Sequence, residues 1–140
     1  MTRLETLEPA FRVKIVALLD EVQKATGRKW ALSDGRRTIA QQNSLYAQGR
    51  TAPGKVVTNA RGGQSAHNFG LAADLWPLTA KGAFDWKASP ALFKTLADIA
   101  KGMGLTSGYY FKSIFDPPHV EDPSWKAVQA SWKRGEVQVA

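Results

Sequence analysis

The apolar run GLAADLW, residues 70–76, restricts the fold of this chain more than any other stretch, because a carboxylate lies within it. The small apolar residues around Asp74 predict a buried strand, and Pro77 predicts the end of that strand. An unpaired carboxylate in such a strand would cost on the order of several kcal/mol. The folded chain must therefore bring a compensating cation to Asp74, and a divalent metal ion suits that position.

The ligands available for such an ion are few, because the chain has no cysteine and only two histidines, His67 and His119. Disulfides and thiolate metal sites are therefore excluded, and a metal must be held by histidine and carboxylate groups. Gly70 allows a sharp turn between His67 and the strand that carries Asp74. We expect His67, Asp74 and His119 to hold one Zn²⁺ per chain, with the fourth position left to water, as catalytic zinc requires.

A general base is expected beside this metal. Asp116 stands three residues before His119, and the two prolines between them stiffen the segment so that both side chains can face one cavity. Glu121 is the alternative, because on a strand that starts near His119 it shares that residue's face. We expect Asp116 to be the base, with Glu121 supporting the ligands or serving as a base in reserve.

The remaining patterns predict a single α+β domain over residues 1–140, with a small, mainly antiparallel sheet flanked by helices. Apolar spacing and cap residues such as Thr38 predict helices at residues 8–24, 38–48, 90–103 and 124–134. Strands are expected at residues 30–33, 70–76 and from 119 onward, and residues 105–115 are aromatic and β-prone. A further short strand is expected at Val56–Val57, within the long loop 49–66.

The net charge of +7 favours an anionic partner, which could be nucleic acid, an acidic membrane surface or a cell-wall polymer. Nucleic acid is not expected, because no helix-turn-helix, zinc finger or aromatic stacking motif is present. The apolar face of the last helix, with Trp125 and Trp132, is expected to pack on the core. Its basic residues, Lys126, Lys133 and Arg134, are expected to be solvated, with weak contact to an anionic wall or membrane surface as the alternative.

The N-terminal sequence has no apolar segment typical of a secretory signal, and no stretch approaches the ~20 apolar residues that span a bilayer. We therefore expect a protein that is synthesised in a cytoplasm without a signal peptide and remains soluble. Action outside the membrane would then depend on another agent that permeabilises it. Nothing in the sequence requires more than a monomer.

The motifs resemble those of the M15 family of zinc peptidases, and within it those of phage endolysins of the L-alanyl-D-glutamate peptidase type. The family pattern Ser-x-His-x-x-Gly-x-Ala-x-Asp is met from Ser65 to Asp74. The acidic residue three positions before a ligand histidine is met by Asp116, and the endopeptidase branch is similar in using Asp there. An upstream element, Ser-Gly-x-Arg-Ser/Thr with a later Gln, is approached by residues 34–38 and Gln42.

This resemblance implies a zinc endopeptidase, a single catalytic domain without a separate wall-binding domain, that hydrolyses the stem peptide of bacterial peptidoglycan at the L-Ala–D-Glu bond. It implies host cell lysis by a phage endolysin that reaches the wall after membrane permeabilisation. Arg37 would bind a substrate carboxylate or the oxyanion, Ser65 would donate a hydrogen bond in the pocket or act as a cap, and Gln42 would adjoin the substrate, chiefly as a buttress. The alternatives are a D-Ala-D-Ala carboxypeptidase or dipeptidase and a non-catalytic wall-binding module.

Three departures from the family pattern concern the substrate subsites rather than the ligands. Asp34 stands where Ser is usual, Thr106–Ser107 replaces a Glu-Trp pair, and Val120 replaces an aromatic residue. The resemblance therefore predicts the reaction class more firmly than the bond cleaved.

Overall fold

Strand β2 (Ala72–Pro77) lies inside the sheet, as the apolar run around Asp74 predicts, in a computed structural model that describes residues 3–140. It pairs with β1 (Trp30–Asp34) on one side and with β4 (His119–Glu121) on the other. The short β3 (Thr106–Ser107) pairs with β4 and completes a sheet of order β1-β2-β4-β3. All three pairings are antiparallel, so the expected α+β class with an antiparallel sheet is confirmed.

The register of the sheet brings distant parts of the sequence together at Asp74. Its Cα pairs with that of Asp34 on β1 and with that of His119 on β4. The pairing with β1 is irregular between Leu32 and Asp34. The carboxylate in the middle of the apolar run therefore has one polar neighbour on each adjacent strand.

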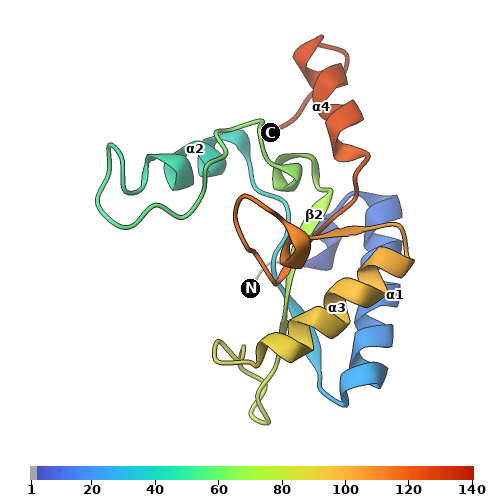
Figure 1. Ribbon diagram of the computed structural model, residues 1–140. Helices are drawn as coiled ribbons and strands as arrows, with labels where there is room; N and C mark the ends of the chain where they lie inside the picture. The colour runs from blue at the N-terminus through green and yellow to red at the C-terminus, as the bar shows by residue number, and fades with distance from the viewer. Residues whose placement is uncertain (1–2) are drawn as a thin grey trace.

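Helices α1 (Pro9–Thr26) and α3 (Pro90–Gly102) lie side by side against the sheet and provide most of the core (Figure 1). Their inward faces show the predicted helical spacing, and the buried residues are Phe11, Ile15, Leu18 and Val22 of α1 and Phe93, Leu96, Ala97 and Ala100 of α3. Both helices begin with proline after a side-chain cap, which is the arrangement expected at a helix start.

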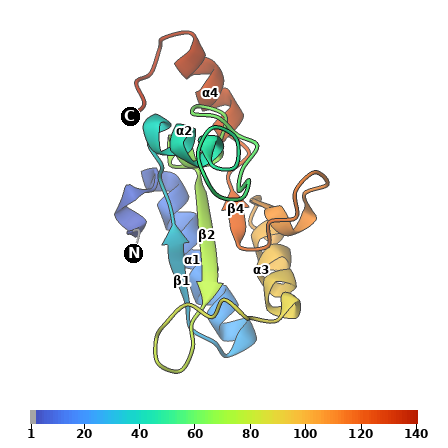
Figure 2. The ribbon, with the colours of Figure 1, turned by 90° about the vertical axis from the view of Figure 1, so that its left-hand side faces the viewer.

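Further helical segments gather around one end of β2 (Figure 2). They are α2 (Ile39–Ala47), the short 3₁₀ helix η2 (Ala66–Phe69) and α4 (Trp125–Lys133). Phe69 of η2 stacks on Trp125 and meets Trp132 edge-on, so the apolar face of α4 packs on the core as expected. The loop between α2 and η2 projects beside this end of the molecule (Figure 1).

Two expected strands differ from what the structure contains. Val56 and Val57 form no strand, because no sheet edge lies beside them and both are more than half exposed, at 54% and 55%. In the β-prone region 105–115, only Thr106–Ser107 is a strand, and the 3₁₀ helix η3 (Gly108–Tyr110) follows at once. Residues with a high β propensity therefore form no strand where they have no neighbouring strand to pair with.

None of the helices in residues 3–140 has the combination of length and apolar character that crossing a lipid bilayer requires.

Candidate metal centre

The structure brings together the three predicted ligands, His67, Asp74 and His119, from η2, β2 and β4. One ligand atom of each lies within 4.8 Å of the other two. Asp74 Oδ1 is 3.4 Å from His67 Nε2 and 3.3 Å from His119 Nδ1. Both imidazoles are buried, so the cluster is rigidly placed at the end of the sheet.

A short capped helix fixes His67. Ser65 is the N-cap of η2, and its hydroxyl accepts a hydrogen bond from the His67 backbone N–H at 3.2 Å. Gly70 ends η2 with a φ of 70°, in the left-handed region that favours glycine. The cap role therefore accounts for Ser65, although the residue also lines the adjoining cleft.

In each imidazole, the nitrogen that points away from Asp74 has a partner of its own, and this contact fixes the orientation of the ring. His67 Nδ1 lies 2.7 Å from the carbonyl oxygen of Gly35, which can only accept, so this nitrogen carries the proton. His119 Nε2 lies 2.7 Å from Glu121 Oε1. These outer contacts leave His67 Nε2 and His119 Nδ1 directed at Asp74 Oδ1, the arrangement that metal-binding histidines need.

Two atoms at the centre of the cluster lack any hydrogen-bond partner within residues 3–140. They are Asp74 Oδ1 and His119 Nδ1, and both are buried. Buried polar atoms are almost always hydrogen-bonded, so an orphaned pair 3.3 Å apart requires an explanation. Two imidazole nitrogens and one carboxylate oxygen form a donor set typical of catalytic zinc, and a cation among them would satisfy both orphaned atoms. The residues therefore fit a zinc ion.

The electrostatics of the cluster also favour a cation. Burial by itself lowers the pKa of His119, but the carboxylates of Asp74 and Glu121 outweigh it and raise the pKa to about 10. Burial raises the pKa of Asp74, but the adjacent imidazoles of His119 and His67 hold it well below its usual range. The chain's own groups thus bind a proton tightly at His119, and a metal ion must displace that proton.

Asp116 lies at the open side of the cluster, with its Oδ2 3.8 Å from His119 Nδ1 and its side chain 45% exposed. Partial burial, and next the charge of Asp74, raise the pKa of Asp116. A raised pKa brings a carboxylate closer to the proton affinity that a general base needs at neutral pH.

Gly108 holds the Asp116 segment in place. The Asp116 N–H donates to the Gly108 carbonyl at 2.9 Å, and the His119 N–H donates to the Asp116 carbonyl at 3.1 Å. A Cβ on Gly108 would overlap the backbone oxygen of Asp116. The sequence did not single out Gly108, because this close approach joins segments that are separated along the chain.

Replacement of Gly108 provides a test of this positioning. Gly108→Ala is expected to displace Asp116 and to lower turnover on the order of 10²-fold, the effect of about 1 Å of misplacement. The metal content should remain near one per chain, because the ligands lie on other segments or beyond the prolines. Gly102→Ala is the matched control, since its Cβ meets nothing within 4 Å at the end of α3. Equal turnover in the two variants would contradict this role for Gly108.

Glu121 has no oxygen free for proton transfer. Its Oε1 lies 2.7 Å from His119 Nε2, and its Oε2 accepts a hydrogen bond from Trp125 Nε1 at 2.6 Å. Of the two roles left open by the sequence, this geometry favours support of the His119 ligand over service as a base.

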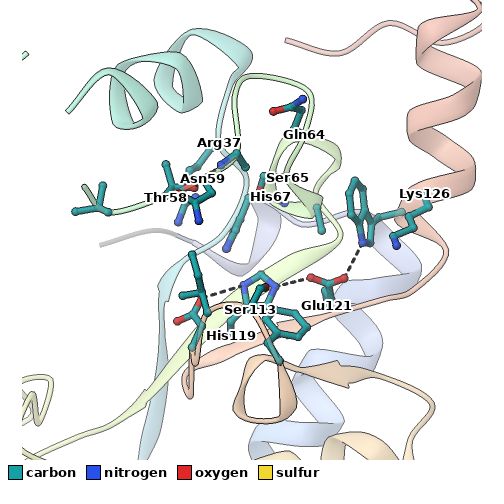
Figure 3. Close-up of a pocket in the computed structure, with 17 residues that line it drawn as sticks. Arg37, Thr58, Asn59, Gln64, Ser65, His67, Ser113, His119, Glu121 and Lys126 are labelled. Atoms are coloured by element: carbon teal, nitrogen blue, oxygen red, sulfur yellow. Dashed lines mark hydrogen bonds and ion pairs between the residues drawn. The ribbon is translucent and has the colours of Figure 1, made fainter. Parts of the chain in front are cut away.

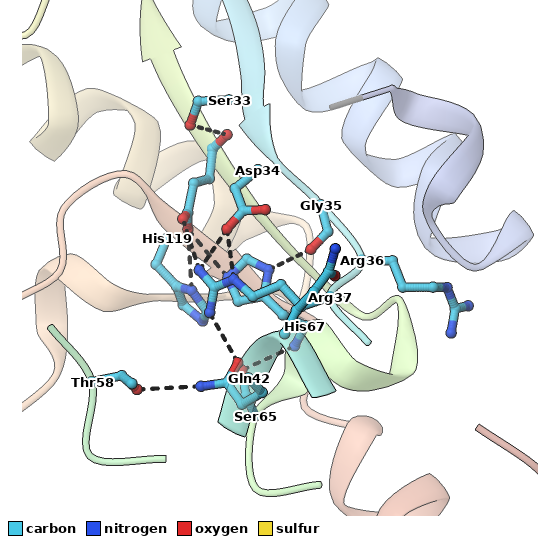
Figure 4. A network of polar contacts seen from close by, with 12 residues as sticks. Ser33, Asp34, Gly35, Arg36, Arg37, Gln42, Thr58, Ser65, His67 and His119 are labelled. Atoms are coloured by element: carbon cyan, nitrogen blue, oxygen red, sulfur yellow. Dashed lines mark hydrogen bonds and ion pairs between the residues drawn. The ribbon is translucent and has the colours of Figure 1, made fainter. Parts of the chain in front are cut away.

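Arg37 lines the cleft, and several acceptors hold its side chain in place (Figure 4). Its Nε and Nη2 lie 2.7 and 2.6 Å from Asp34 Oδ2, and its Nη1 donates to Gln42 Oε1 at 3.1 Å. Its Nη2 also lies 3.7 Å from Asp74 Oδ2. Gln42 is fully buried and donates to the Ala60 carbonyl, so it buttresses Arg37 from behind the cleft wall.

A cleft of about 480 Å³ opens beside the cluster (Figure 3). Its walls are the loop residues 57–60, the segment from Phe111 to Asp116 and the start of α4. The cleft reaches His67, His119 and Asp116, so a peptide bound there can meet the metal ligands and the expected base together.

Asn68 is a positioning residue that the sequence analysis missed. Its buried side chain accepts from the N–H groups of Gly63 and Ser65 and donates to the Arg37 carbonyl at 3.1 Å. It therefore ties η2 to the Arg37 segment. The spacing Ser65-x-x-Asn68, which completes a capping box at the start of η2, was the available signal.

The fold and the cluster together define the class: an α+β domain with a His/Asp/His candidate metal centre and a further carboxylate beside an open cleft. Comparison with known proteins shows which proteins the chain is similar to. A family model described as D-alanyl-D-alanine carboxypeptidase (Peptidase_M15_4) matches residues 58–122, which include all three candidate ligands. This chain is also 36% identical over 100 residues to the peptidoglycan L-alanyl-D-glutamate endopeptidase CwlK of Bacillus subtilis (strain 168).

The match to CwlK covers 64% of this chain and 58% of CwlK, so the chain spans less than two thirds of that relative. Among solved structures, the L-Ala D-Glu endopeptidase ChiX of Serratia marcescens aligns with a TM-score of 0.60 at 18% identity, over 89% of this chain and 86% of ChiX. The D,D-pentapeptidase VanY in complex with Zn(II) aligns with a TM-score of 0.60 at 16% identity, over 92% of this chain and 79% of VanY. These matches bear out the resemblance to the M15 peptidases that the motifs indicate.

Proposed function

We propose that this protein is a zinc-dependent endopeptidase that hydrolyses the stem peptide of bacterial peptidoglycan at the L-Ala–D-Glu bond. The observation that carries the proposal is the orphaned pair Asp74 Oδ1 and His119 Nδ1. This pair requires a cation, and it lies beside a carboxylate of raised pKa in an open cleft. A site that served only structure would be expected to have all four coordination positions closed by protein ligands.

A bound zinc ion would supply Lewis acidity, which polarises a peptide carbonyl and lowers the pKa of a water molecule. The chain's own residues would perform the remaining tasks. Asp116 would accept a proton during attack and pass it to the leaving amine. Glu121 would keep the His119 ring oriented, as outer partners of metal ligands do.

Arg37 would stabilise negative charge on the substrate oxygen. Asp34 already neutralises its guanidinium at 2.6–2.7 Å, which favours the oxyanion role over capture of a substrate carboxylate. Its five N–H donors exceed the contacts made to Asp34 and Gln42, so donors remain for the cleft that Arg37 lines. Donors fixed in advance in this way stabilise a developing oxyanion most effectively.

The choice of the L-Ala–D-Glu bond is supported by the relatives. CwlK and ChiX are both named for that activity, and CwlK is the relative at 36% identity. The second candidate, a D-Ala-D-Ala carboxypeptidase, is favoured by the description of the matching family model. The lytic role of a phage endolysin, acting on the wall as a monomer, belongs to the same proposal and is suggested by the resemblance in the motifs.

A single digestion experiment separates these candidates. Protein loaded with zinc, at one ion per chain by elemental analysis, is expected to clear a suspension of purified walls and to release new D-Glu amino termini, identified by mass spectrometry. Release of D-Ala instead would establish the carboxypeptidase. Walls that remain intact, with zinc bound, would leave only a binding module.

A further inference from the structure

We propose that Lys126, at the start of α4, binds a carboxylate of the substrate next to the cleaved bond and makes the enzyme selective for acidic stem peptides. This inference rests on the proposed function and adds the residue that sets its substrate class. It begins with the charges in the cleft. Among the described residues that line it, and apart from the two candidate ligand histidines, only Arg37 and Lys126 are cationic, and only Asp116 and Glu121 are acidic.

The two cations differ in whether the protein already neutralises them. Arg37 shares Asp34 Oδ2 between its Nε and Nη2 at 2.7 and 2.6 Å. Lys126 makes no ion pair and no side-chain hydrogen bond with any residue from 3 to 140. A substrate carboxylate would have to displace Asp34 from Arg37, whereas at Lys126 it would meet only a cation–π contact with the Trp125 ring, at 6.0 Å.

The acidic residues near the start of α4 are also fully engaged. The two carboxylate oxygens of Glu121 contact His119 and Trp125, one each. Asp122 accepts from the Ser124 N–H at 2.9 Å and pairs with Lys14 at 3.1 Å. Neither carboxylate therefore compensates Lys126.

The position of Lys126 in its helix supports the same conclusion. It lies in the first turn of α4, which contains no acidic residue. A cation there opposes the positive end of the helix dipole, whereas an anion at that end is stabilised by it. A carboxylate bound at Lys126 would satisfy the lysine and the helix end together.

Hydrogen bonds fix this helix end relative to the metal cluster. Glu121 joins His119 to Trp125 through contacts of 2.7 and 2.6 Å, and Lys126 is the next residue (Figure 3). Gln129, one turn further along α4, donates to the Gly63 carbonyl at 2.7 Å. The lysine is thus anchored at its backbone on the cleft side of the ligands, while its side chain remains exposed.

The chemistry of the proposed substrate supplies the anion. A D-Glu residue has two carboxyl groups, and only one of them continues the peptide chain. The other is a free carboxylate on the residue that contributes the nitrogen of the L-Ala–D-Glu bond, unless it is amidated. Among the described residues, Lys126 is the cleft lysine or arginine without an ion pair, and it would bind one such group.

The test uses two synthetic stem peptides that differ only in whether this carboxyl is a carboxylate or a carboxamide. Lys126→Met is expected to raise KM for the carboxylate peptide about 10- to 100-fold, the range for loss of a charge-assisted hydrogen bond. KM for the carboxamide peptide and kcat for both should change little, and Lys126→Arg should restore selectivity. Lys133→Met, on the same helix but outside the cleft, is the matched control.

Binding measured in the zinc-loaded Asp116→Asn background gives a second result that does not depend on turnover. There, Lys126→Met should weaken the carboxylate peptide alone. If Lys126→Met affects both peptides equally, or neither, the inference is overturned. If wild-type protein binds the two peptides with charge selectivity but hydrolyses neither, the proposed peptidase function fails and the role of Lys126 stands.

Discussion

Asp116→Asn is expected to lower kcat for wall peptides by about 10²–10⁴-fold while zinc remains bound, which is the usual contribution of a positioned general base. The amide keeps the size of the carboxylate but cannot accept the proton. Asp116 is not one of the three clustered ligands, so the zinc affinity should stay close to that of the wild type. Steady-state kinetics combined with elemental analysis of the same sample would measure both quantities.

Glu121→Gln is the matched control, since it makes the same chemical change at the other carboxylate of the cleft. It should disturb the His119 and Trp125 contacts and weaken zinc binding, typically about 10–100-fold for an outer partner of a ligand. At saturating zinc its kcat should largely recover. Wall hydrolysis at the wild-type rate by Asp116→Asn, or an unrecovered loss in Glu121→Gln, would move the base from Asp116 to Glu121.

The sequence predicted the centre of this site because its strongest signals are local. Asp74 within an apolar run predicts both a buried strand and a need for a cation, and both follow from burial alone. Gly70 predicts the turn that lets His67 meet Asp74, and the structure gives it a φ of 70°. The helices followed apolar spacing closely, with α1 and α4 ending within two residues of the expected bounds.

The remaining features could not be predicted, because they depend on the register of the strands and on which segments the fold brings side by side. Asp34 and Arg37 are only three residues apart, but the sequence offers no signal that this pair lies beside Asp74, since that depends on how β1 pairs with β2. Lys126 was indistinguishable from an ordinary solvated lysine until the Glu121 bridge placed it at the cleft. Val56–Val57 had the composition of a strand but no neighbour with which to pair.

Asp74→Asn is expected to abolish zinc binding and, with it, all activity. Asp74 Oδ1 is the atom shared by both histidines, at 3.4 and 3.3 Å, so its loss should exceed the roughly 10–100-fold effect of losing an outer partner. Calorimetric zinc titration is the direct measurement. Asp98→Asn is the control, since Asp98 is an exposed aspartate paired with Lys94 and Tyr110, remote from the cluster. Retained stoichiometric zinc in Asp74→Asn would remove Asp74 from the ligand set.

The same substitution should alter the pH dependence of stability in chelator-treated protein. The raised pKa of His119, from 6.5 to about 10, contributes stability that is fully present below pH 6.5 and is lost as the pH rises through 10. The depressed pKa of Asp74 contributes stability above its usual value of 3.8 that is lost as the pH falls below it. The Tm of wild-type protein treated with chelator should therefore fall as the pH rises above 6.5. The Tm of Asp74→Asn should fall less over the same range.

Zinc must displace the proton that Asp74 and Glu121 hold on His119, so proton and metal compete for one nitrogen. In wild-type protein the zinc affinity should rise about tenfold per pH unit until the pH reaches about 10, with release of one proton that is visible in buffers of different ionisation enthalpy. The increase in Tm on adding zinc should become larger over the same range. The chelator-treated protein loses stability as the pH rises, whereas zinc binds more tightly. A zinc affinity independent of pH would show that His119 is already neutral in the chelated protein, and the electrostatic account of the cluster would fail.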